Sequence, residues 1–219
     1  LRTTDLEQMV AHRTGELESF QLESLQRVAV LAEFRSIEAV DHPLRVGDLA
    51  ADIAAEIGED PEFVDRLRLA ARLHDIGKIA VPDTILLKPG PLAAEEFDLV
   101  KTHAQMGAEI LRGSASSVIQ LAEELAVSHH ERWDGGGYPT GSRGEDTPLS
   151  GRIVAIADVY DALLSARVYK RAWSALEAVH FVAAGSGTQF EPRLVDAFVT
   201  VMLRRHPQLA AQDDPSPPA

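Results

Sequence analysis

Apolar residues recur at helical spacing in one segment after another, and three of these apolar stripes contain a histidine. His103 follows Leu99 by four positions and precedes Met106 by three, while His74 and His129 close similar stripes. Residues three and four apart share one face of an α-helix. The spacing therefore predicts a succession of amphipathic helices, each of which brings an imidazole to its apolar side. We expect an all-α fold.

The remaining segments carry helix signals and hardly any strand signals. Residues 2–38 contain no proline and read as one long amphipathic helix, which either packs on its own domain or pairs in a dimer. Only residues 79–81 look extended. The sequence begins with leucine rather than methionine, so we expect a fragment whose missing part holds an upstream domain. The predicted organisation is a linker or signalling helix (1–38), a helical domain (39–206) and a disordered tail (207–219).

Composition narrows the chemistry. Cysteine is absent, so disulfides and thiolate metal sites are excluded, and any metal must be held by His, Asp, Glu or water. The formal net charge of −13 argues against a nucleic-acid polymer or an anionic membrane as partner. No apolar run reaches the roughly 18 residues that span a bilayer. We expect a cytoplasmic domain, whose parent protein could still be anchored in a membrane.

Several ionisable residues fall where a helical core is expected. A single histidine there is more often a hydrogen-bonded core residue than a ligand, but each buried imidazole or carboxylate needs a partner of its own. A pair of divalent cations would satisfy many of them together, since it neutralises carboxylates and accepts lone pairs from neutral imidazoles. The residues that favour this interpretation are His74, Asp75, His103, His129, His130 and Asp158.

Two sequence motifs carry a family resemblance. The string HDIGK at residues 74–78 resembles the signature of the HD phosphohydrolase superfamily. The string HHERWDGGGYP at residues 129–139 is similar to the second motif of the HD-GYP family within it. Together the two strings are highly specific, and the resemblance extends over about residues 33–200.

The resemblance implies a fold, a cofactor and a reaction. HD-GYP domains are all-α bundles with a His/Asp centre of two or three divalent ions, usually iron or manganese. They hydrolyse cyclic di-GMP, a bacterial second messenger, to pGpG and often on to GMP, and diguanylate cyclases (GGDEF) are implied partners. The implied metal ligands are Glu38, His42, His74, Asp75, His103, His129, His130 and Asp158, with Glu38 belonging to a third metal.

The resemblance also assigns residues around the metals. Asp75 would bridge two ions, which acidify a water for attack on phosphorus. Lys78, one turn further on, would offset charge on the scissile phosphate. The substrate-binding residues implied are Tyr138, Arg167 and Lys170.

One departure from the family pattern concerns the first ligand. Pro43 directly follows His42, which predicts an extended His42 and places Glu38 and His42 on different elements.

Three functions remain open at this point. The leading one is a metal-dependent cyclic di-GMP phosphodiesterase. The others are a phosphohydrolase for another cyclic dinucleotide and a catalytically silent module that senses cyclic di-GMP or acts as a scaffold. The sequence leaves open the native metal, the number of ions, and whether hydrolysis stops at pGpG.

Overall fold

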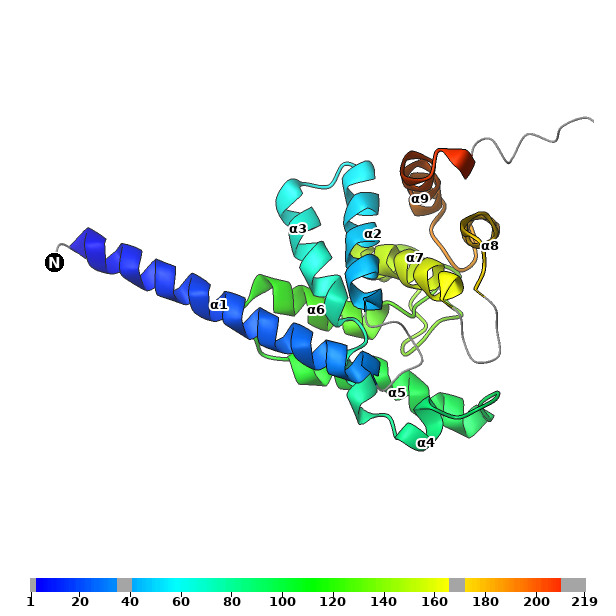
Figure 1. Cartoon of the computed structure of the whole chain (residues 1–219), viewed down its shortest axis with the longest axis horizontal. Helices are drawn as coiled ribbons and strands as arrows, with labels where there is room; N and C mark the ends of the chain where they lie inside the picture. The colour runs from blue at the N-terminus through cyan, green and yellow to red at the C-terminus, as the bar shows by residue number, and fades with distance from the viewer. Residues whose placement is uncertain (1–2, 35–40, 166–171, 210–219) are drawn as a thin grey trace, which may run out of the picture.

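The computed structural model describes residues 3–34, 41–165 and 172–209, which form helices joined by turns and loops (Figure 1). The α-helices are α1 (Thr3–Phe34), α2 (His42–Glu56), α3 (Pro61–Ala70), α4 (Asp83–Leu86), α5 (Ala94–Leu111), α6 (Ser117–Ser128), α7 (Leu149–Leu164), α8 (Ala175–Ala184) and α9 (Pro192–Arg205). Three 3₁₀ turns join them: η1 (Ala71–Leu73), η2 (Ile76–Ala80) and η3 (Gly144–Asp146). The all-α prediction is confirmed. The extended piece expected at 79–81 is wrong, because η2 occupies most of it.

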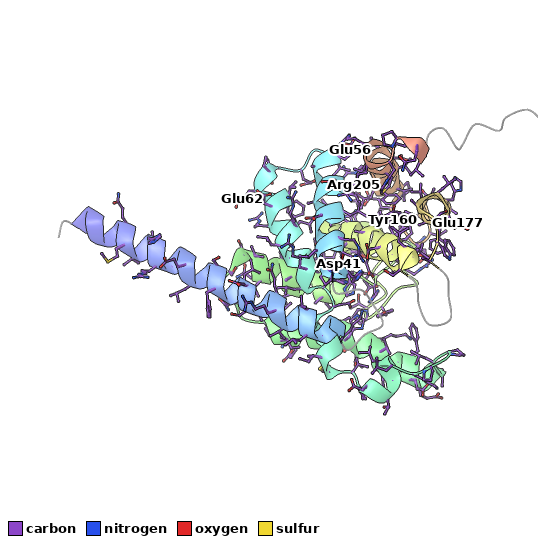
Figure 2. All side chains as sticks on the ribbon, in the orientation of Figure 1. Asp41, Glu56, Glu62, Tyr160, Glu177 and Arg205 are labelled. Carbon is purple, nitrogen blue, oxygen red and sulfur yellow. The ribbon has the colours of Figure 1, made fainter. Side chains whose placement is uncertain are left out.

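The bundle is built around α2, which packs against α3 on one side and α7 on the other. Its apolar face is fully buried, with Val46 and Ile53 at 0% exposure. Helices α5 and α6 form a second layer, and α8 and α9 close the far side (Figure 1). Helix α9 is tied to α2 by Arg204 with Glu56, at 2.5 Å between Nη2 and Oε2; Figure 2 shows Glu56 close to the α9 residue Arg205.

The starts of several helices follow from local side-chain chemistry. Asp60 caps α3 by accepting from Phe63 N at 3.0 Å, with proline at the next position. Ser174 and Glu177 form both bonds of a capping box at the start of α8. These ends agree with the expectation from sequence.

The start of α2 differs from expectation. His42 is the first residue of the helix rather than an extended residue. Pro43 is tolerated there because amide groups in the first helical turn have no acceptor within the helix, so proline removes no hydrogen bond. His42 is consequently fixed at the N-terminus of α2.

Helix α1 leaves the bundle for half of its length. Ala29 and Ala32 near its end are buried against the body, whereas Val10, Leu17 and Phe20 are exposed, and the first turns project away from the other helices (Figure 1). The helix is described to Phe34, so the predicted linker residues 35–38 and most of the predicted tail lie outside the described residues. Among the helices described, none combines the length and apolarity that a bilayer crossing requires.

Candidate metal centre

Seven of the eight predicted ligands come together inside the bundle. They form two clusters, and within each cluster one ligand atom per residue lies within 4.8 Å of the others. The first cluster consists of Asp75, His103, His129 and His130, and the second of His42, His74 and Asp158. They arrive from the start of α2, the junction of η1 and η2, the middle of α5, the end of α6 and the middle of α7.

Asp75 lies between the two clusters. Its Oδ1 is 3.2 Å from His103 Nε2 and 3.5 Å from His129 Nε2. Its Oδ2 is 3.2 Å from His74 Nε2 and 2.6 Å from Lys78 Nζ. One carboxylate thus faces imidazoles of both clusters, which is the position a bridging ligand would need.

Asp158 takes the corresponding place in the second cluster. Its Oδ1 lies 3.3 Å from His42 Nε2 and 3.7 Å from His74 Nε2. It is carried by α7, where the preceding residues Ala157 and Ile156 are fully buried. The largely buried carboxylate therefore needs the two imidazoles, or a cation, as partners.

The backbone orients the histidines toward this space. The Nδ1 atoms of His74, His103 and His129 donate to main-chain carbonyls one turn earlier, at 2.8, 2.6 and 3.0 Å. A proton on Nδ1 leaves the Nε2 lone pair of each ring directed inward. Among the described residues, Nε2 of His74 and His129 and Oδ1 of Asp75 are buried without a hydrogen-bond partner. Divalent cations fit this donor set, because they would satisfy these orphaned atoms together.

Two imidazoles of the first cluster, His129 and His130, favour the neutral form. Burial lowers the pKa of His129, and burial together with the neighbouring His129 holds the pKa of His130 well below its usual range. Burial opposes ionisation of Asp75, but Lys78 and His74 outweigh it and keep the pKa of that carboxyl well below normal. Neutral imidazole and ionised carboxylate are the protonation states that bind a metal.

In the second cluster, the imidazoles of His42 and His74 favour the protonated form when no cation is bound. Burial disfavours a charged His42, but Asp158 and Asp161 outweigh it and raise the pKa of His42 to about 10. The pKa of His74 is likewise raised, since Asp75 and Asp158 outweigh burial. These protons balance the carboxylates where a cation would otherwise do so. Metal binding here must displace them, and it therefore weakens as the pH falls.

Sequence reasoning missed the residues that hold His42. Asp161 Oδ2 accepts from His42 Nδ1 at 2.7 Å, and the same carboxylate receives Arg45 Nε at 2.6 Å and Nη2 at 2.8 Å. Asp161 is buried and lies one helical turn after Asp158 on α7. That spacing of three was the available signal, because it places both carboxylates on one helix face.

Replacing Asp161 with asparagine should weaken metal binding by the second cluster, although it removes none of that cluster's ligands. The amide can still face His42, but it loses the charge that aligns both His42 and Arg45. We expect metal affinity to fall about 10- to 100-fold, the range for partners that orient a ligand. Metal titration of the apo protein measures this. Asp196→Asn, an exposed site on α9, is the matched control, and equal affinities in both variants would contradict the prediction.

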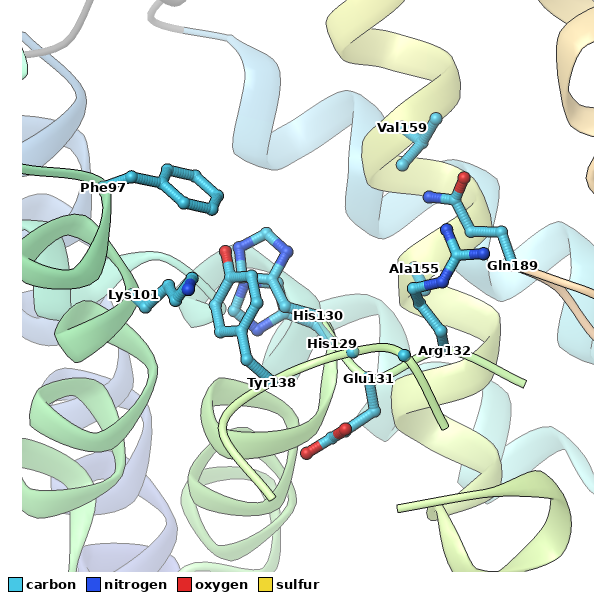
Figure 3. Close-up of a pocket in the computed structure, with 12 residues that line it drawn as sticks. Phe97, Lys101, His129, His130, Glu131, Arg132, Tyr138, Ala155, Val159 and Gln189 are labelled. Carbon is cyan, nitrogen blue, oxygen red and sulfur yellow. The ribbon is translucent and has the colours of Figure 1, made fainter. Parts of the chain in front are cut away.

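An open cavity of about 360 Å³ adjoins the first cluster (Figure 3). His129 and His130 form part of its wall, and the Tyr138 ring lies 4.7 Å from the His130 ring between centroids. Burial, with Asp75 and Asp158, raises the pKa of Tyr138, so its hydroxyl remains a donor. Tyr138 thus lies on the wall of an open cavity, and its role toward the substrate stays a prediction.

Hydrogen bonds to Glu131 and His130 hold the loop that carries Tyr138. Glu131 is buried, and its Oε1 accepts from both the main-chain N and the Oγ1 of Thr140 at 2.7 Å. Tyr138 N also donates to His130 O at 3.2 Å. The loop between the two histidines and Thr140 is therefore closed onto the metal centre.

The other predicted site residues have different outcomes. Lys78 is buried, and its ammonium lies against Asp75. Glu38, Arg167 and Lys170 lie outside the described residues, so their roles stay predictions.

Comparison with known proteins gives a consistent result. The family model of the HD domain matches residues 20–194. The chain is 46% identical over 184 residues to a cyclic di-GMP phosphodiesterase of Thermotoga maritima, covering 84% of this chain and 50% of that protein. It is 44% identical over 198 residues to the cyclic di-GMP phosphodiesterase response regulator RpfG of Xanthomonas campestris pv. campestris, covering 90% and 52%. The chain thus spans about half the length of these curated relatives.

A solved structure shares the fold. A cyclic GMP-AMP specific phosphodiesterase of V. cholerae superposes with a TM-score of 0.60 at 19% identity, covering 85% of this chain and 50% of that one. At that identity the similarity concerns the helical architecture alone.

Proposed function

This chain belongs to the HD-GYP branch of the HD domain family, and on that premise we propose that it is the catalytic part of a metal-dependent cyclic di-GMP phosphodiesterase. One observation carries the proposal. Two buried His/Asp clusters share the carboxylate of Asp75 beneath an open cavity. Relatives that match most of this chain are named for this activity, which supports the choice of substrate.

We propose two divalent ions, one in each cluster, with iron or manganese as the metal. The imidazole-rich donor set with carboxylates suits such ions, and the absence of cysteine removes the thiolates that softer sites use. Glu38 would serve a third ion. When bound, two such metal ions would lower the pKa of a water molecule toward neutrality and polarise the phosphoryl oxygens.

The surrounding residues would bind and orient the phosphodiester. Tyr138 offers a protonated hydroxyl on the cavity wall beside His130. Lys78 keeps Asp75 ionised and adds positive charge beside the position of the scissile phosphate. Arg167 and Lys170 would hold the substrate's phosphates, since guanidinium and ammonium groups pair with them in an otherwise acidic chain. The proposed products are pGpG and then GMP.

Anaerobically purified protein, loaded with iron or manganese, tests this function by chromatography of its products from cyclic di-GMP. We expect pGpG first and GMP later. If the protein hydrolysed another cyclic dinucleotide and left cyclic di-GMP intact, the substrate assignment would change to that dinucleotide. Metal-replete protein that binds cyclic di-GMP tightly without forming product would instead support a sensor or scaffold module.

We further propose that two copies pair along the projecting half of α1. Val10, Leu17 and Phe20 are 57%, 69% and 70% exposed there, and Val10 and Leu17 are seven residues apart. A heptad spacing of apolar residues is typical of a helix that pairs with a second helix. A second copy of the chain supplies the same stripe, so the contact would be self-complementary.

Leu17→Lys should dissociate this dimer, because it places a charge in the apolar seam. Sedimentation velocity would then show a shift from dimer to monomer. Ser19→Lys introduces the same charge two residues away, outside the seam, and should leave the dimer intact. A wild-type chain that is monomeric at every concentration would show the pairing proposal to be wrong.

The proposed substrate also suggests functional partners and a cellular compartment. A phosphodiesterase that removes cyclic di-GMP acts on the pool made by diguanylate cyclases, so we propose GGDEF proteins as functional partners. We place the domain in the cytoplasm for the same reason.

A further inference from the structure

Two hollows flank the metal centre. The first is the cavity beside Tyr138, His129 and His130. The second, also about 360 Å³, is lined by Asp158 together with apolar residues that include Leu163 and Phe181. Each hollow therefore borders a predicted ligand of a different metal cluster.

Gln189 lies on the boundary between these hollows. With Val159 it lines both of them, and Figure 3 shows its amide at the cavity edge. A cyclic dinucleotide has two purines on either side of a ring of two phosphodiesters. If one phosphodiester lies at the metal centre, the attached bases extend toward such hollows, and a boundary residue can contact a base edge.

The main chain of Gln189 is held in place, and its side-chain amide has hydrogen-bonding capacity to offer. Its main-chain O accepts from Trp133 N at 3.1 Å, and the preceding Thr188 O accepts from Asp134 N at 2.8 Å. These bonds fix the loop to the segment that carries the metal-site histidines. Within the part of the chain that the structure describes, the Gln189 side chain makes no hydrogen bond, so both its donor and its acceptor are available to a ligand.

A second polar group accompanies it. The Arg132 guanidinium lies beside Gln189 in the same cavity (Figure 3). Its Nε and Nη2 are held by Asp134 at 3.0 and 2.6 Å, and Nη1 has no hydrogen-bond partner within the described ranges. The pair of residues thus offers donors from a fixed guanidinium next to an amide that can donate and accept.

This combination distinguishes the two purines. Guanine presents O6 and N7 as acceptors, which suit arginine, and an N1–H donor, which suits the amide oxygen. Adenine presents an amino donor in place of O6, so an arginine opposite it would face another donor. The arrangement therefore favours guanine at this position.

We propose that Gln189 is a specificity-determining residue that, with Arg132, selects guanine over adenine in the bound cyclic dinucleotide. The inference rests on the proposed function, since the site must take a cyclic dinucleotide.

Gln189→Leu tests it, because leucine keeps the side-chain size and removes both polar atoms. We compare kcat/KM for cyclic di-GMP, cyclic di-AMP and bis(p-nitrophenyl) phosphate, a phosphodiester without a base. The wild type should prefer cyclic di-GMP over cyclic di-AMP, and the variant should lose about ten-fold or more of kcat/KM on cyclic di-GMP. Hydrolysis of the base-free diester should stay within about two-fold, since the metal centre is untouched. Arg132→Met should lower the same preference.

Gln105→Leu makes the same change at an exposed position on α5 outside both hollows and should behave as wild type. Unchanged preference in Gln189→Leu, with cyclic di-GMP still cleaved, would overturn the inference and leave the proposed function intact. Equal losses on the base-free diester, or loss of bound metal, would also overturn it, because Gln189 would then act through the fold. A wild type that cleaves the base-free diester but no cyclic dinucleotide would overturn the proposed function itself.

Discussion

Asp75→Asn should abolish phosphodiesterase activity and strip the centre of metal. The carboxylate lies within 3.5 Å of imidazoles from both clusters, so its loss affects both. An amide supplies no negative charge, and its NH₂ end would face inward-directed lone pairs. We expect turnover to fall about 1,000-fold or more, equivalent to about 4 kcal/mol of lost transition-state stabilisation.

Activity and metal content should be measured on the same samples. Asp65→Asn, at an exposed site on α3, makes the same chemical change and should match the wild type. Circular dichroism and the melting temperature separate loss of metal from loss of fold. An Asp75→Asn protein that retains two ions and turns over within ten-fold of wild type would refute the bridging role.

Gly77→Ala should destabilise the bundle and disturb the centre together. A Cβ at this position would lie 1.9 Å from His103 O and 2.5 Å from Gly107 N, both main-chain atoms of α5. No rotamer can relieve a clash with backbone, so η2 must move away from α5. Overpacking of this kind costs about 3 kcal/mol, which for a chain of this size lowers the melting temperature by roughly 6–12 °C.

The change also reaches the site, because Asp75 lies two residues before Gly77, Lys78 follows it directly, and His103 provides the contacted carbonyl. Metal affinity should therefore fall along with stability. Gly15→Ala is the control: nothing lies within 4 Å of its would-be Cβ, and alanine favours a helix by up to about 1 kcal/mol. If both variants melt at the wild-type temperature, the close contact between η2 and α5 is not as described.

Much of this architecture could be predicted because it is local. Apolar spacing of three and four residues indicated the helices, and Asp60 and Ser174 indicated where two of them begin. The positions of His74, His103 and His129 on apolar faces predicted that they would be buried, as they are. Their convergence depended on the motif resemblance, since spacing within one helix says nothing about which helices meet.

The parts that escaped prediction involve distant residues or close backbone contact. The spacing of Asp158 and Asp161 could place both carboxylates on one helix face, but it could not show that His42, 119 positions from Asp161, bonds to it. Pro43 argued for an extended His42, but the first turn of a helix accepts proline without losing a bond. The contact of Lys78 with Asp75 depends on how η2 turns, so the sequence did not reveal it, and the role of Lys78 toward the substrate stays a prediction.

Anomalous diffraction from crystals of the metal-loaded protein tests the central claim most directly. The account predicts two adjacent peaks in the bundle, one against Asp75, His103, His129 and His130 and one against His42, His74 and Asp158, with the Asp75 carboxylate contacting both. A saturated, active protein whose only metal lies elsewhere, or whose clusters hold no anomalous density, would contradict it.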